Sequence, residues 1–451
     1  MKVIIIGGGF SGCQAAIQAR KMGAEVHIIE RTDMLLGVGN VGGIMRNNGR
    51  FTAAEELSYL GANEIIDIMD DLALHKNIEF TGHKHANLTD IGKAEPTIRR
   101  LILSLGINIH FKSRGINVVL EDNSITKIKL SDGTFIDGDV FIETTGSTGP
   151  MTNCNRYGNG CSMCILRCPT FGGRESLSLK AGINDIVGER ANGTPGAMSG
   201  SCELPRESLS SELLEELTTK GVVTLPIPKE DVNLDKLSQK VCQQYALKEF
   251  AENVILLDTG HIKLMTSYYP LETLRKIPGL ENARYIDPLS GGKSNSIRYL
   301  ASSPRDNKMK IKGLNNMFCA GEKSGFFIGH TEAMATGALA GFNAVRYLLN
   351  KPLLELPRKL AIGDIIAFAN ETLDMENGKS IRHTFSGGQY FERMKKLNLY
   401  TTDKEKIKDR VESLSLLNIF NKWQNRCYRL TVTSIFSNLK IYFLLLLLDT
   451  F

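Results

Sequence analysis

This 451-residue chain has no long apolar run, few aromatic residues and little excess charge of either sign. Its apolar stretch near the C-terminus, residues 441–448, is much shorter than the roughly twenty residues that a membrane-spanning helix needs. We therefore expect no membrane span. The formal net charge of +5 is slight for this length, so it neither requires nor excludes a nucleic-acid partner.

The chain also lacks the marks of a small secreted protein. Its nine cysteines do not resemble a disulfide framework in a chain of this length, so a reducing, cytoplasmic setting is expected. The first apolar strand begins at residue 2, which argues against a signal peptide. A hydrophobic content of 42% is ordinary for a globular protein, and the length allows two or three domains.

The first thirty residues carry the clearest motif. Residues 2–6 are apolar and β-branched, which is typical of a buried parallel strand. They lead into a Gly-x-Gly-x-x-Gly frame on Gly7, Gly9 and Gly12, followed by a helical pattern. A second strand pattern ends in Glu30, 18 residues after Gly12. This order of strand, glycine turn, helix, strand and acid is the context of a dinucleotide-binding site.

Each part of the motif has a physical task. Gly7 permits a tight turn, Gly9 lets the backbone approach a pyrophosphate, and Gly12 allows close helix–strand packing. The start of the helix, with Phe10 and Ser11, directs free N–H groups and a positive dipole end toward phosphates. Glu30 can accept hydrogen bonds from ribose hydroxyls. A glycine-rich turn without ligand is the bland alternative, and these residues do not distinguish FAD from NAD.

A glycine-dense loop, residues 31–43, follows the second strand and suggests close passage over a ligand, with a mobile surface loop as the alternative. Arg31 and Gly43 are its candidate cofactor contacts. Beyond it, Arg46 and Arg50 could donate to phosphate or substrate. His75, His83 and His85 lie in a polar stretch without metal-ligand spacing, so a loop histidine in the active site is the functional alternative there.

Residues 107–146 predict a strand, a three-stranded antiparallel meander and a returning buried strand that ends in Thr144, Thr145 and Gly146. This order resembles the flavoproteins of the glutathione-reductase type, which have two dinucleotide-binding domains. The resemblance implies that Thr145 and Gly146 pack against the ADP half of FAD.

A cysteine cluster follows, with the spacing Cys-x6-Cys-x2-Cys-x3-Cys-Pro on Cys154, Cys161, Cys164 and Cys168. Its last three cysteines match the end of the bacterial ferredoxin run, but the first interval is six rather than two. A [4Fe–4S] cluster is the leading interpretation. A zinc site and reduced or redox-active thiols stay open, although four-cysteine zinc sites usually show two separated Cys-x2-Cys pairs. Four other cysteines are read as ordinary thiols: Cys13, Cys242, Cys319 and Cys427.

No nucleotide or metal pattern recurs between residues 171 and 286. We expect helices over 208–220 and 234–252, short strands over 222–227 and 254–257, and a substrate or cap domain inserted into the cofactor domain. Within it, residues 260–263 and 268–269 offer polar and aromatic side chains for a site, or for packing between domains.

The closing segment favours FAD over NAD. Residues 311–322 lead through a strand into Ala320, Gly321 and Glu322, where glycine lets backbone approach the ribityl side and the acid can bond a ribityl hydroxyl. After His330, a helix rich in small residues runs over 331–349, so that Thr331 lies at its start. In FAD folds, such a helix directs its N-terminus toward the flavin; a core helix packed closely on the sheet is the alternative.

The stretches Ile-Pro-Gly-Leu-Glu-Asn-Ala at 277–283, Met-Phe-Cys-Ala-Gly-Glu at 317–322 and the helix after them are similar to the glucose-inhibited division protein A superfamily. That superfamily includes flavoproteins that modify tRNA uridines. The chain looks closest to uncharacterised Cys-rich FAD-dependent oxidoreductases of anaerobic bacteria. The tRNA-modifying relatives have a cysteine before a Gly-Gly pair in the loop after the second strand, whereas residues 36–43 contain none. Without it, activation of uracil lacks its obvious nucleophile.

The expected fold is therefore α/β, with a Rossmann-like FAD-binding domain of glutathione-reductase type, an inserted α+β cap and a mostly helical C-terminal region. The expected boundaries are 1–150 and 291–350 for the FAD domain, 151–290 for the cap, and 351–451 for the last region. Arg382 and His383 could reach the active site, although a surface hairpin is the simpler expectation.

The expected function is an FAD-dependent oxidoreductase coupled to an iron–sulfur cluster, acting on a small molecule or a protein electron partner. A tRNA uridine-modifying flavoprotein and a non-catalytic flavin-bound scaffold are the alternatives, and a homo-oligomer is a further expectation. The candidate catalytic residues, chosen for their position near glycine-rich or cofactor-side loops, are Arg46, His85, Lys293 and His330.

Overall fold

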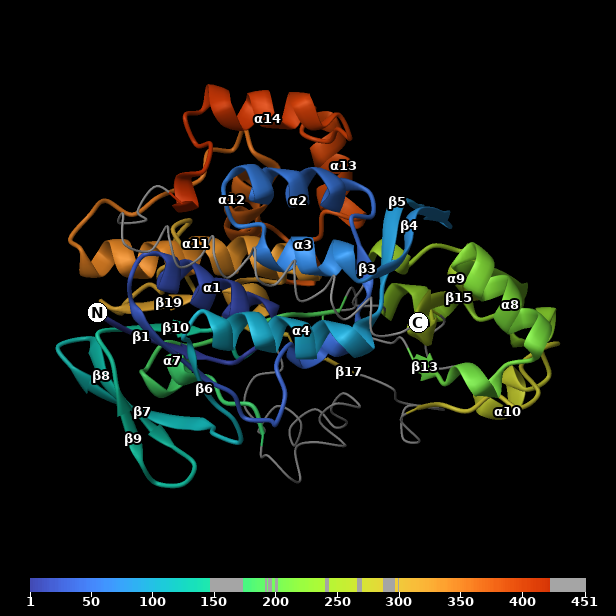
Figure 1. The fold of residues 1–451 in the computed structure, drawn as a ribbon, viewed down its shortest axis with the longest axis horizontal. Helices are drawn as coiled ribbons and strands as arrows, with labels where there is room; N and C mark the ends of the chain where they lie inside the picture. Colours follow the sequence, from blue (N-terminus) through green and yellow to red (C-terminus); the bar gives the residue numbers. More distant parts are fainter. Residues whose placement is uncertain are drawn as a thin grey trace, which may run out of the picture.

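A five-stranded parallel sheet forms the centre of the molecule in the computed structural model (Figure 1). The structure describes residues 1–146, 173–190, 193, 197–198, 202–239, 243–265, 270–286, 297–298 and 300–421. The strand order β19-β10-β1-β2-β6 brings β1 and β19, which lie more than 300 residues apart in the sequence, into one sheet. Its strands are β1 (Lys2–Ile6), β2 (Glu25–Ile29), β6 (Asn108–His110), β10 (Val140–Glu143) and β19 (Met317–Cys319). The expected α/β class is confirmed.

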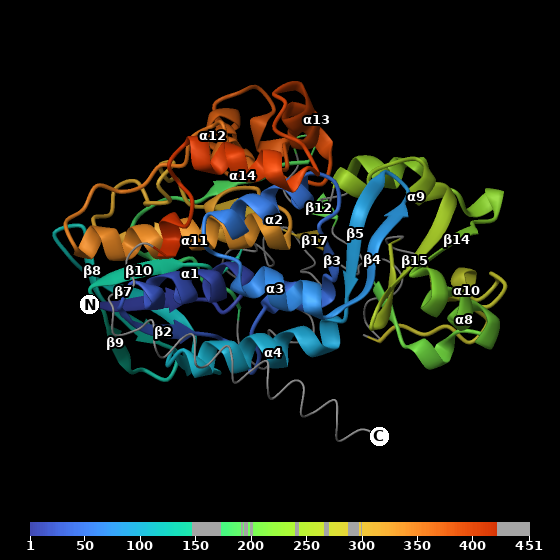
Figure 2. The ribbon, with the colours of Figure 1, turned by 45° about the horizontal axis from the view of Figure 1, so that its top comes forward.

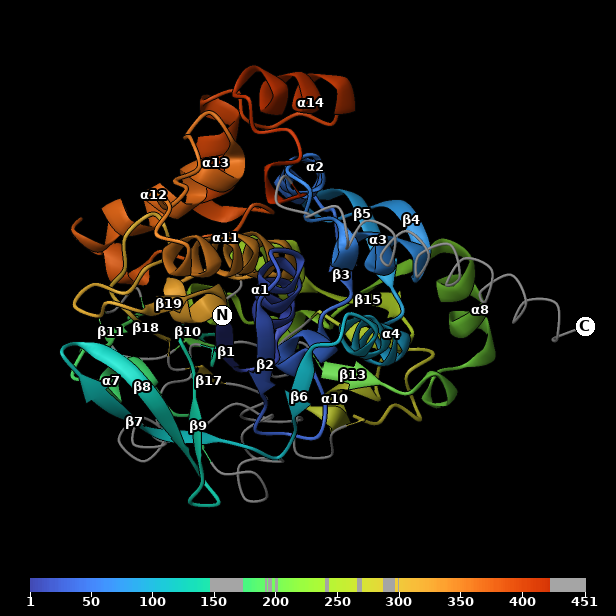
Figure 3. The same ribbon diagram turned by 60° about the vertical axis from the view of Figure 1, so that its left-hand side comes forward.

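Helices cover one face of this sheet and a meander covers the other (Figure 3). Helices α1 (Phe10–Lys21) and α11 (His330–Leu348) pack on the first face, in one core with Val3 and Ile5. Alternate residues of the same strand, Ile4 and Ile6, point to the second face. There they meet the antiparallel meander of β7 (Gly115–Glu121), β8 (Ser124–Leu130) and β9 (Phe135–Asp137). The predicted meander and helix are confirmed to within one residue at most ends.

Two smaller sheets stand beside the central sheet and pack on each other (Figure 2). The first has the order β3-β5-β4 and the second the order β13-β16-β15-β14. Their strands are β3 (Ile44–Met45), β4 (Ala73–Phe80), β5 (His83–Thr89), β13 (Cys202–Leu204), β14 (Val222–Pro226), β15 (Asn253–Thr259) and β16 (His261–Leu264). Apolar side chains such as Leu88 and Leu257 fill the space between them.

Two expectations in this part are wrong. The three histidines at 75, 83 and 85 are not in a loop but on the β4–β5 hairpin. The helix expected over 234–252 is replaced, within the described residues, by two 3-10 turns and the short helix α9 (Glu249–Glu252). The other helices between β2 and β19 are α2 (Gly49–Tyr59), α3 (Glu64–Asp71), α4 (Ile91–Ser104), α7 (Leu177–Lys180), α8 (Ser211–Lys220) and α10 (Leu271–Leu274).

The C-terminal helices lie over α2 and α11, as Figures 1 and 2 show. They are α12 (Ala361–Leu373), α13 (Gly388–Lys396) and α14 (Lys404–Ser413). The segment before α13 is no surface hairpin: Arg382 is 2% exposed and His383 1%, and His383 forms an isolated parallel bridge with Phe327. This segment, which begins 34 residues after the end of α11 (382 − 348), is thus part of the core, because apolar and hydrogen-bonding partners surround it.

Two-residue strands complete the described fold: β11 (Ile186–Val187) pairs with β18 (Ala301–Ser302), and β12 (Ala197–Met198) with β17 (Ile297–Arg298). No helix among the described residues is both long and apolar enough to cross a membrane. Cys154, Cys161, Cys164, Cys168 and Lys293 lie outside the described residues. The division into four segments stays a prediction.

Candidate cofactor and active site

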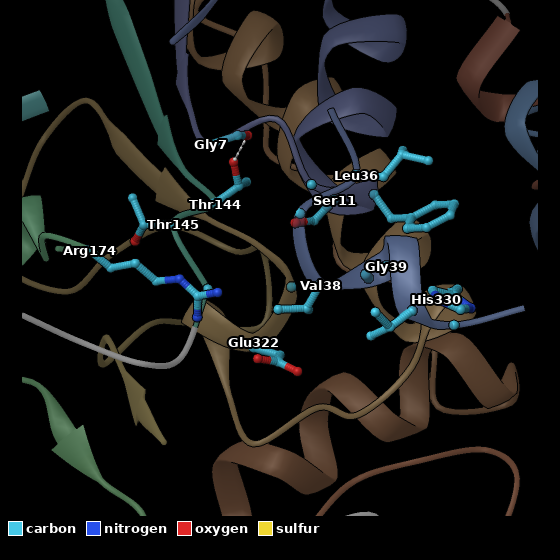
Figure 4. Close-up of a pocket in the computed structure, with 18 of the residues that line it drawn as sticks. Gly7, Ser11, Leu36, Val38, Gly39, Thr144, Thr145, Arg174, Glu322 and His330 are labelled. Carbon is cyan, nitrogen blue, oxygen red and sulfur yellow. Dashed lines mark hydrogen bonds between the residues drawn. The ribbon is translucent and has the colours of Figure 1, made fainter. Parts of the chain in front are cut away.

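A pocket opens where β1, β2 and β10 end and where α1 and α11 begin. This is the carboxyl edge of a parallel sheet, the usual place for a ligand in such folds. Eleven predicted residues line it: Gly7, Gly9, Phe10, Ser11, Glu30, Arg31, Thr145, Gly146, Gly321, Glu322 and His330. Figure 4 shows Thr145 and Arg174 toward one end, Gly39 and His330 toward the other, and Ser11, Val38 and Glu322 between them.

The glycine turn is built by two close approaches of backbone and one side-chain hydrogen bond. Gly7 has a φ of +105°, and a Cβ there would lie 2.4 Å from the Thr144 carbonyl oxygen. A Cβ on Gly12 would lie 2.0 Å from the Gly7 carbonyl oxygen. The Thr144 hydroxyl donates to that same oxygen at 2.6 Å (Figure 4). A Cβ on Gly9, in contrast, would meet nothing within 4 Å, so Gly9 borders open space at the start of α1.

The carboxylate of Glu30 is held in a fixed orientation. One oxygen accepts the Gly8 backbone N–H at 2.8 Å, and the other accepts the Thr32 N–H and hydroxyl, both at 2.8 Å. The side chain is 6% exposed and lines the pocket. Glu30 therefore ties the glycine turn to the end of β2, where an adenosine ribose would lie.

Helix α11 approaches α1 closely because both helices carry small residues. A Cβ on Gly337 would lie 2.3 Å from the Ser11 carbonyl oxygen, and one on Gly341 would lie 2.2 Å from that of Ala15. Gly321 has a φ of +64°, and a Cβ there would lie 2.6 Å from the Ser11 Oγ. Helix α11 is therefore packed tightly in the core, and its N-terminus borders the pocket.

Two cations, Arg50 and Lys263, lie at the α11 end of the pocket near His330. Burial, Arg50 and Lys263 lower the pKa of His330 to about 3, so its imidazole is neutral near pH 7. The ring lies 4.6 Å from that of Phe10, centroid to centroid. Its Nδ1 has no hydrogen-bond partner among the described residues, and neither has the hydroxyl of buried Thr331. These orphaned polar atoms are suited to a bound ligand.

Arg50 connects the pocket to the C-terminal region. It pairs with Glu332 at 3.2 Å, and the two side chains are 4% and 0% exposed. Arg50 also donates to the Ile328 carbonyl oxygen and the Thr384 hydroxyl, while Glu332 accepts the Phe385 backbone N–H at 2.8 Å. Residues 384–385 are therefore fixed behind the pocket wall.

Two candidate catalytic residues lie away from the pocket lining. Arg46 makes ion pairs with Asp70 and Glu55, both at 2.6 Å, and is largely buried. His85 accepts or donates at Asn77, 3.1 Å away, on the β5 strand. Of the cofactor candidates, Gly12, Gly43 and Thr331 also fall outside the lining, where Gly12 shapes the turn.

The glycine-dense loop expected over residues 31–43 does border the pocket. Residues 36–42 form a 3-10 turn along it, and Lys263, from the stretch considered for a site, reaches it from β16. Several other lining residues were not predicted from the sequence. The missed residues are Ser113, Arg114, Arg174, Gln244, Tyr245 and Met265. None belongs to a local motif, so the sequence held no signal for them.

The residues present fit a dinucleotide such as FAD. The open space beside Gly9 admits a pyrophosphate, Glu30 faces the ribose position, and Glu322 and α11 border the far half of the pocket. Among the described residues, no group of three or more His, Cys, Asp or Glu side chains is arranged to hold a metal ion. Cys13 and Cys319 are buried free thiols, as expected, and burial raises the pKa of Cys319 to about 12.

Comparison with known proteins points in one direction. The model of a family described as "Glucose inhibited division protein A" matches residues 2–203 and 236–352. A tRNA uridine 5-carboxymethylaminomethyl modification enzyme of Desulfotalea psychrophila is 23% identical, with 81% of this chain and 63% of that protein aligned. A methylenetetrahydrofolate–tRNA-(uracil-5-)-methyltransferase of Natranaerobius thermophilus is 24% identical, over 82% of this chain and 89% of that protein.

Among solved structures, GidA of Aquifex aeolicus aligns with a TM-score of 0.60 at 16% identity, covering 91% of this chain and 76% of that one. A second crystal form gives 0.57. The shared fold is therefore the one seen in that structure. This chain spans about three-fifths of the length of the carboxymethylaminomethyl-modifying relatives.

Proposed function

Because this chain belongs to the glucose inhibited division protein A family, we propose that it is an FAD-dependent enzyme that modifies uridines in tRNA. The observation that carries the proposal is the pocket itself, where the glycine turn, Glu30, Glu322 and the start of α11 converge. The names of the matched relatives support the tRNA substrate over the small-molecule oxidoreductase that the sequence first suggested. Flavin supplies redox chemistry when bound, and the chain binds and orients it.

The roles of the chain's residues follow from their positions. We assign cofactor binding to Gly7, Gly9, Ser11, Glu30 and Glu322. His330, neutral and at the pocket end near α11, is the catalytic candidate that keeps its support; Arg46 and His85, held in contacts outside the pocket lining, lose theirs. Residues 36–43, which border the pocket, contain no thiol, so covalent activation of uracil by a cysteine of this loop has no place in the proposal.

Two measurements test the proposal. Purified protein should contain FAD, identified by chromatography of the released flavin. A deletion strain should lack one uridine modification in its tRNA nucleosides, as measured by mass spectrometry, and the wild-type gene should restore it, whereas Gly9→Val should not. An unchanged nucleoside profile in the deletion strain would make the tRNA substrate wrong while leaving FAD binding intact.

A second candidate keeps the cysteine cluster in use: FAD exchanging electrons singly with a [4Fe–4S] centre on Cys154, Cys161, Cys164 and Cys168. One observation favours it. The two described ends of the cysteine-rich segment, Gly146 and Arg174, both line the pocket, and a Cβ on Gly146 would lie 3.7 Å from Arg174 Nη1. Described residues on both sides of the cysteine-rich segment therefore lie beside the proposed cofactor position.

Anaerobic preparation with assays for iron, acid-labile sulfide and zinc tests this candidate. Four iron atoms per chain that are lost in Cys161→Ser/Cys164→Ser support the cluster. Stoichiometric zinc would favour the structural alternative. FAD in protein that contains neither iron nor zinc would exclude the cluster and the zinc site. Reduction of that flavin by an electron donor would then argue against a non-catalytic scaffold.

A further inference from the structure

Three sources of positive potential meet at the α11 end of the pocket. Arg50 and Lys263 line it, and the 19-residue helix α11 begins there with the positive end of its dipole. His330 is the first residue of α11 and lines the same pocket, beside Gly39 (Figure 4). Both cations act on its imidazole, which places them within electrostatic range of the same ring.

The two cations are held by different contacts. Arg50 faces the buried carboxylate of Glu332 at 3.2 Å, so its charge is largely balanced. Lys263 is 4% exposed on β16, and its ammonium donates to the Val41 carbonyl oxygen of the loop along the pocket. Its cross-strand neighbour on β13 is Glu203. Burial raises the pKa of Glu203, whereas the nearby Lys263 charge lowers it, so this carboxyl lies within electrostatic range of the ammonium.

The direction of a bound FAD would place its flavin ring, the redox-active half, at the α11 end of the pocket. Glu30 and the glycine turn take the adenosine and pyrophosphate, so a dinucleotide extended along the pocket directs its other half toward His330 and Lys263. Resting on the proposed FAD binding, we propose that Lys263 sets the reduction potential of the flavin by placing an ammonium beside the redox end of the pocket.

The charge balance gives the sign. Reduction of FAD by two electrons and one proton yields an anion, FADH⁻, which is more negative than the oxidised cofactor. A fixed cation stabilises that product more than the reactant. Loss of the Lys263 charge should therefore make the flavin harder to reduce, and a positive replacement should not.

The experiment measures the two-electron midpoint potential of the FAD-loaded full chain, reduced anaerobically by dithionite against a reference dye. Lys263→Met should lower the equilibrium constant of reduction at least tenfold, about 30 mV for a two-electron couple. Lys263→Arg should keep the potential near the wild-type value. Lys76→Met, which removes the same charge at an exposed position of β4 outside the pocket lining, is the control and should leave the potential unchanged.

FAD content is measured first, so that the two proposals fail separately. Wild-type protein that takes up no FAD would overturn the proposed function and this inference with it. Fully loaded Lys263→Met with the wild-type potential would overturn the inference alone. Lys263→Gln gives a second neutral variant should the Met substitution prevent folding, and an equal drop in the Arg variant would show a packing effect and count against the charge.

Discussion

Gly9 and Gly12 lie three residues apart in one turn, yet the structure needs them for different reasons. A side chain on Gly12 would collide with the Gly7 backbone, whereas one on Gly9 would extend into open space. The fold therefore requires Gly12 to be a glycine, and we propose that the bound cofactor is what requires Gly9 to be one.

This difference gives a prediction at the residue scale. Gly9→Ala should leave the stability of the FAD-free protein within about 0.5 kcal/mol of wild type, because its backbone conformation is ordinary and its surroundings are open. The same change should weaken FAD binding about tenfold or more, since the methyl group takes space needed by the pyrophosphate. Gly12→Ala should instead destabilise the FAD-free protein by about 1–3 kcal/mol. Thermal unfolding and fluorescence titration with FAD measure the two effects, and a destabilised Gly9→Ala would contradict the assignment.

Glu30 allows a second test of the same site. Glu30→Gln keeps the size of the side chain but weakens the three charge-assisted hydrogen bonds that the carboxylate accepts, one from Gly8 and two from Thr32. We expect the FAD dissociation constant to rise by about tenfold or more, because hydrogen bonds to charged groups contribute about 1.5–3 kcal/mol. Isothermal titration calorimetry measures the dissociation constant. Glu79→Gln, at an exposed position of β4, is the matched control, and equal FAD affinities in the two variants would contradict the role assigned to Glu30.

At the scale of elements, the contact between α1 and α11 determines where the pocket ends. The Cβ-free faces of Gly337 and Gly341 let α11 approach within contact of the α1 backbone. Its N-terminus is thereby brought beside Phe10 and the glycine turn. The same packing that closes the core also positions the helix dipole.

Replacement of Gly341 by alanine tests this packing. In an ordinary helix interior the change stabilises a protein by roughly 0.5–1 kcal/mol. Here the added methyl would lie 2.2 Å from the Ala15 carbonyl oxygen, so we expect the sign to reverse, with a loss of about 1–3 kcal/mol. Gly92→Ala in the exposed first turn of α4 is the control and should be neutral or stabilising. Urea unfolding measures both, and a stabilised Gly341→Ala would mean that the helices have room to spare.

At the scale of the whole molecule, the C-terminal region is part of the pocket's support. Glu56 on α2 accepts the backbone N–H groups of Ala361 and Ile362, both at 3.0 Å, and Glu332 accepts that of Phe385. His383 is enclosed with them, and its Nε2 lies 3.1 Å from the Thr372 hydroxyl. Burial lowers the pKa of His383 to about 3.

That burial predicts a loss of stability in mild acid. The unfolded chain protonates this histidine below its ordinary pKa of about 6.5, while the folded protein does not until about pH 3. Between these values the unfolded state binds more protons, so stability falls as the pH falls, by about 1.4 kcal/mol per pH unit from His383. His330 shifts in the same direction and adds to the effect.

The measurement is urea unfolding at pH 7 and at pH 5.5. His383→Phe, which removes the titration and keeps a ring, should lose less stability than wild type on acidification, by about 1.4 kcal/mol. His261→Gln, a change at an exposed position, is the control and should lose as much stability as wild type between pH 7 and pH 5.5. Identical acid sensitivity in His383→Phe and wild type would show that the buried imidazole does not control this loss.

The sequence alone determined the parts of this protein that depend on neighbouring residues. The glycine turn, the strand before it, the helix after it, the meander and α11 each have a local pattern of apolar residues, glycines and turn residues, and each lies where that pattern predicted it. The proposed nucleotide contacts of Gly7, Gly9 and Glu30 belong to this group, because the motif contains its own geometry.

Only the tertiary structure decided the rest. Arg50 meets Glu332 across 282 residues of sequence, and Lys263 reaches the pocket from a strand of a different sheet. Arg46, chosen for its position near the same loop, is turned into ion pairs with Asp70 and Glu55. The physical reason is that charged side chains have no periodicity that reveals their partners. Which of them face the pocket depends on how distant strands and helices pack, and that packing is set by the core as a whole.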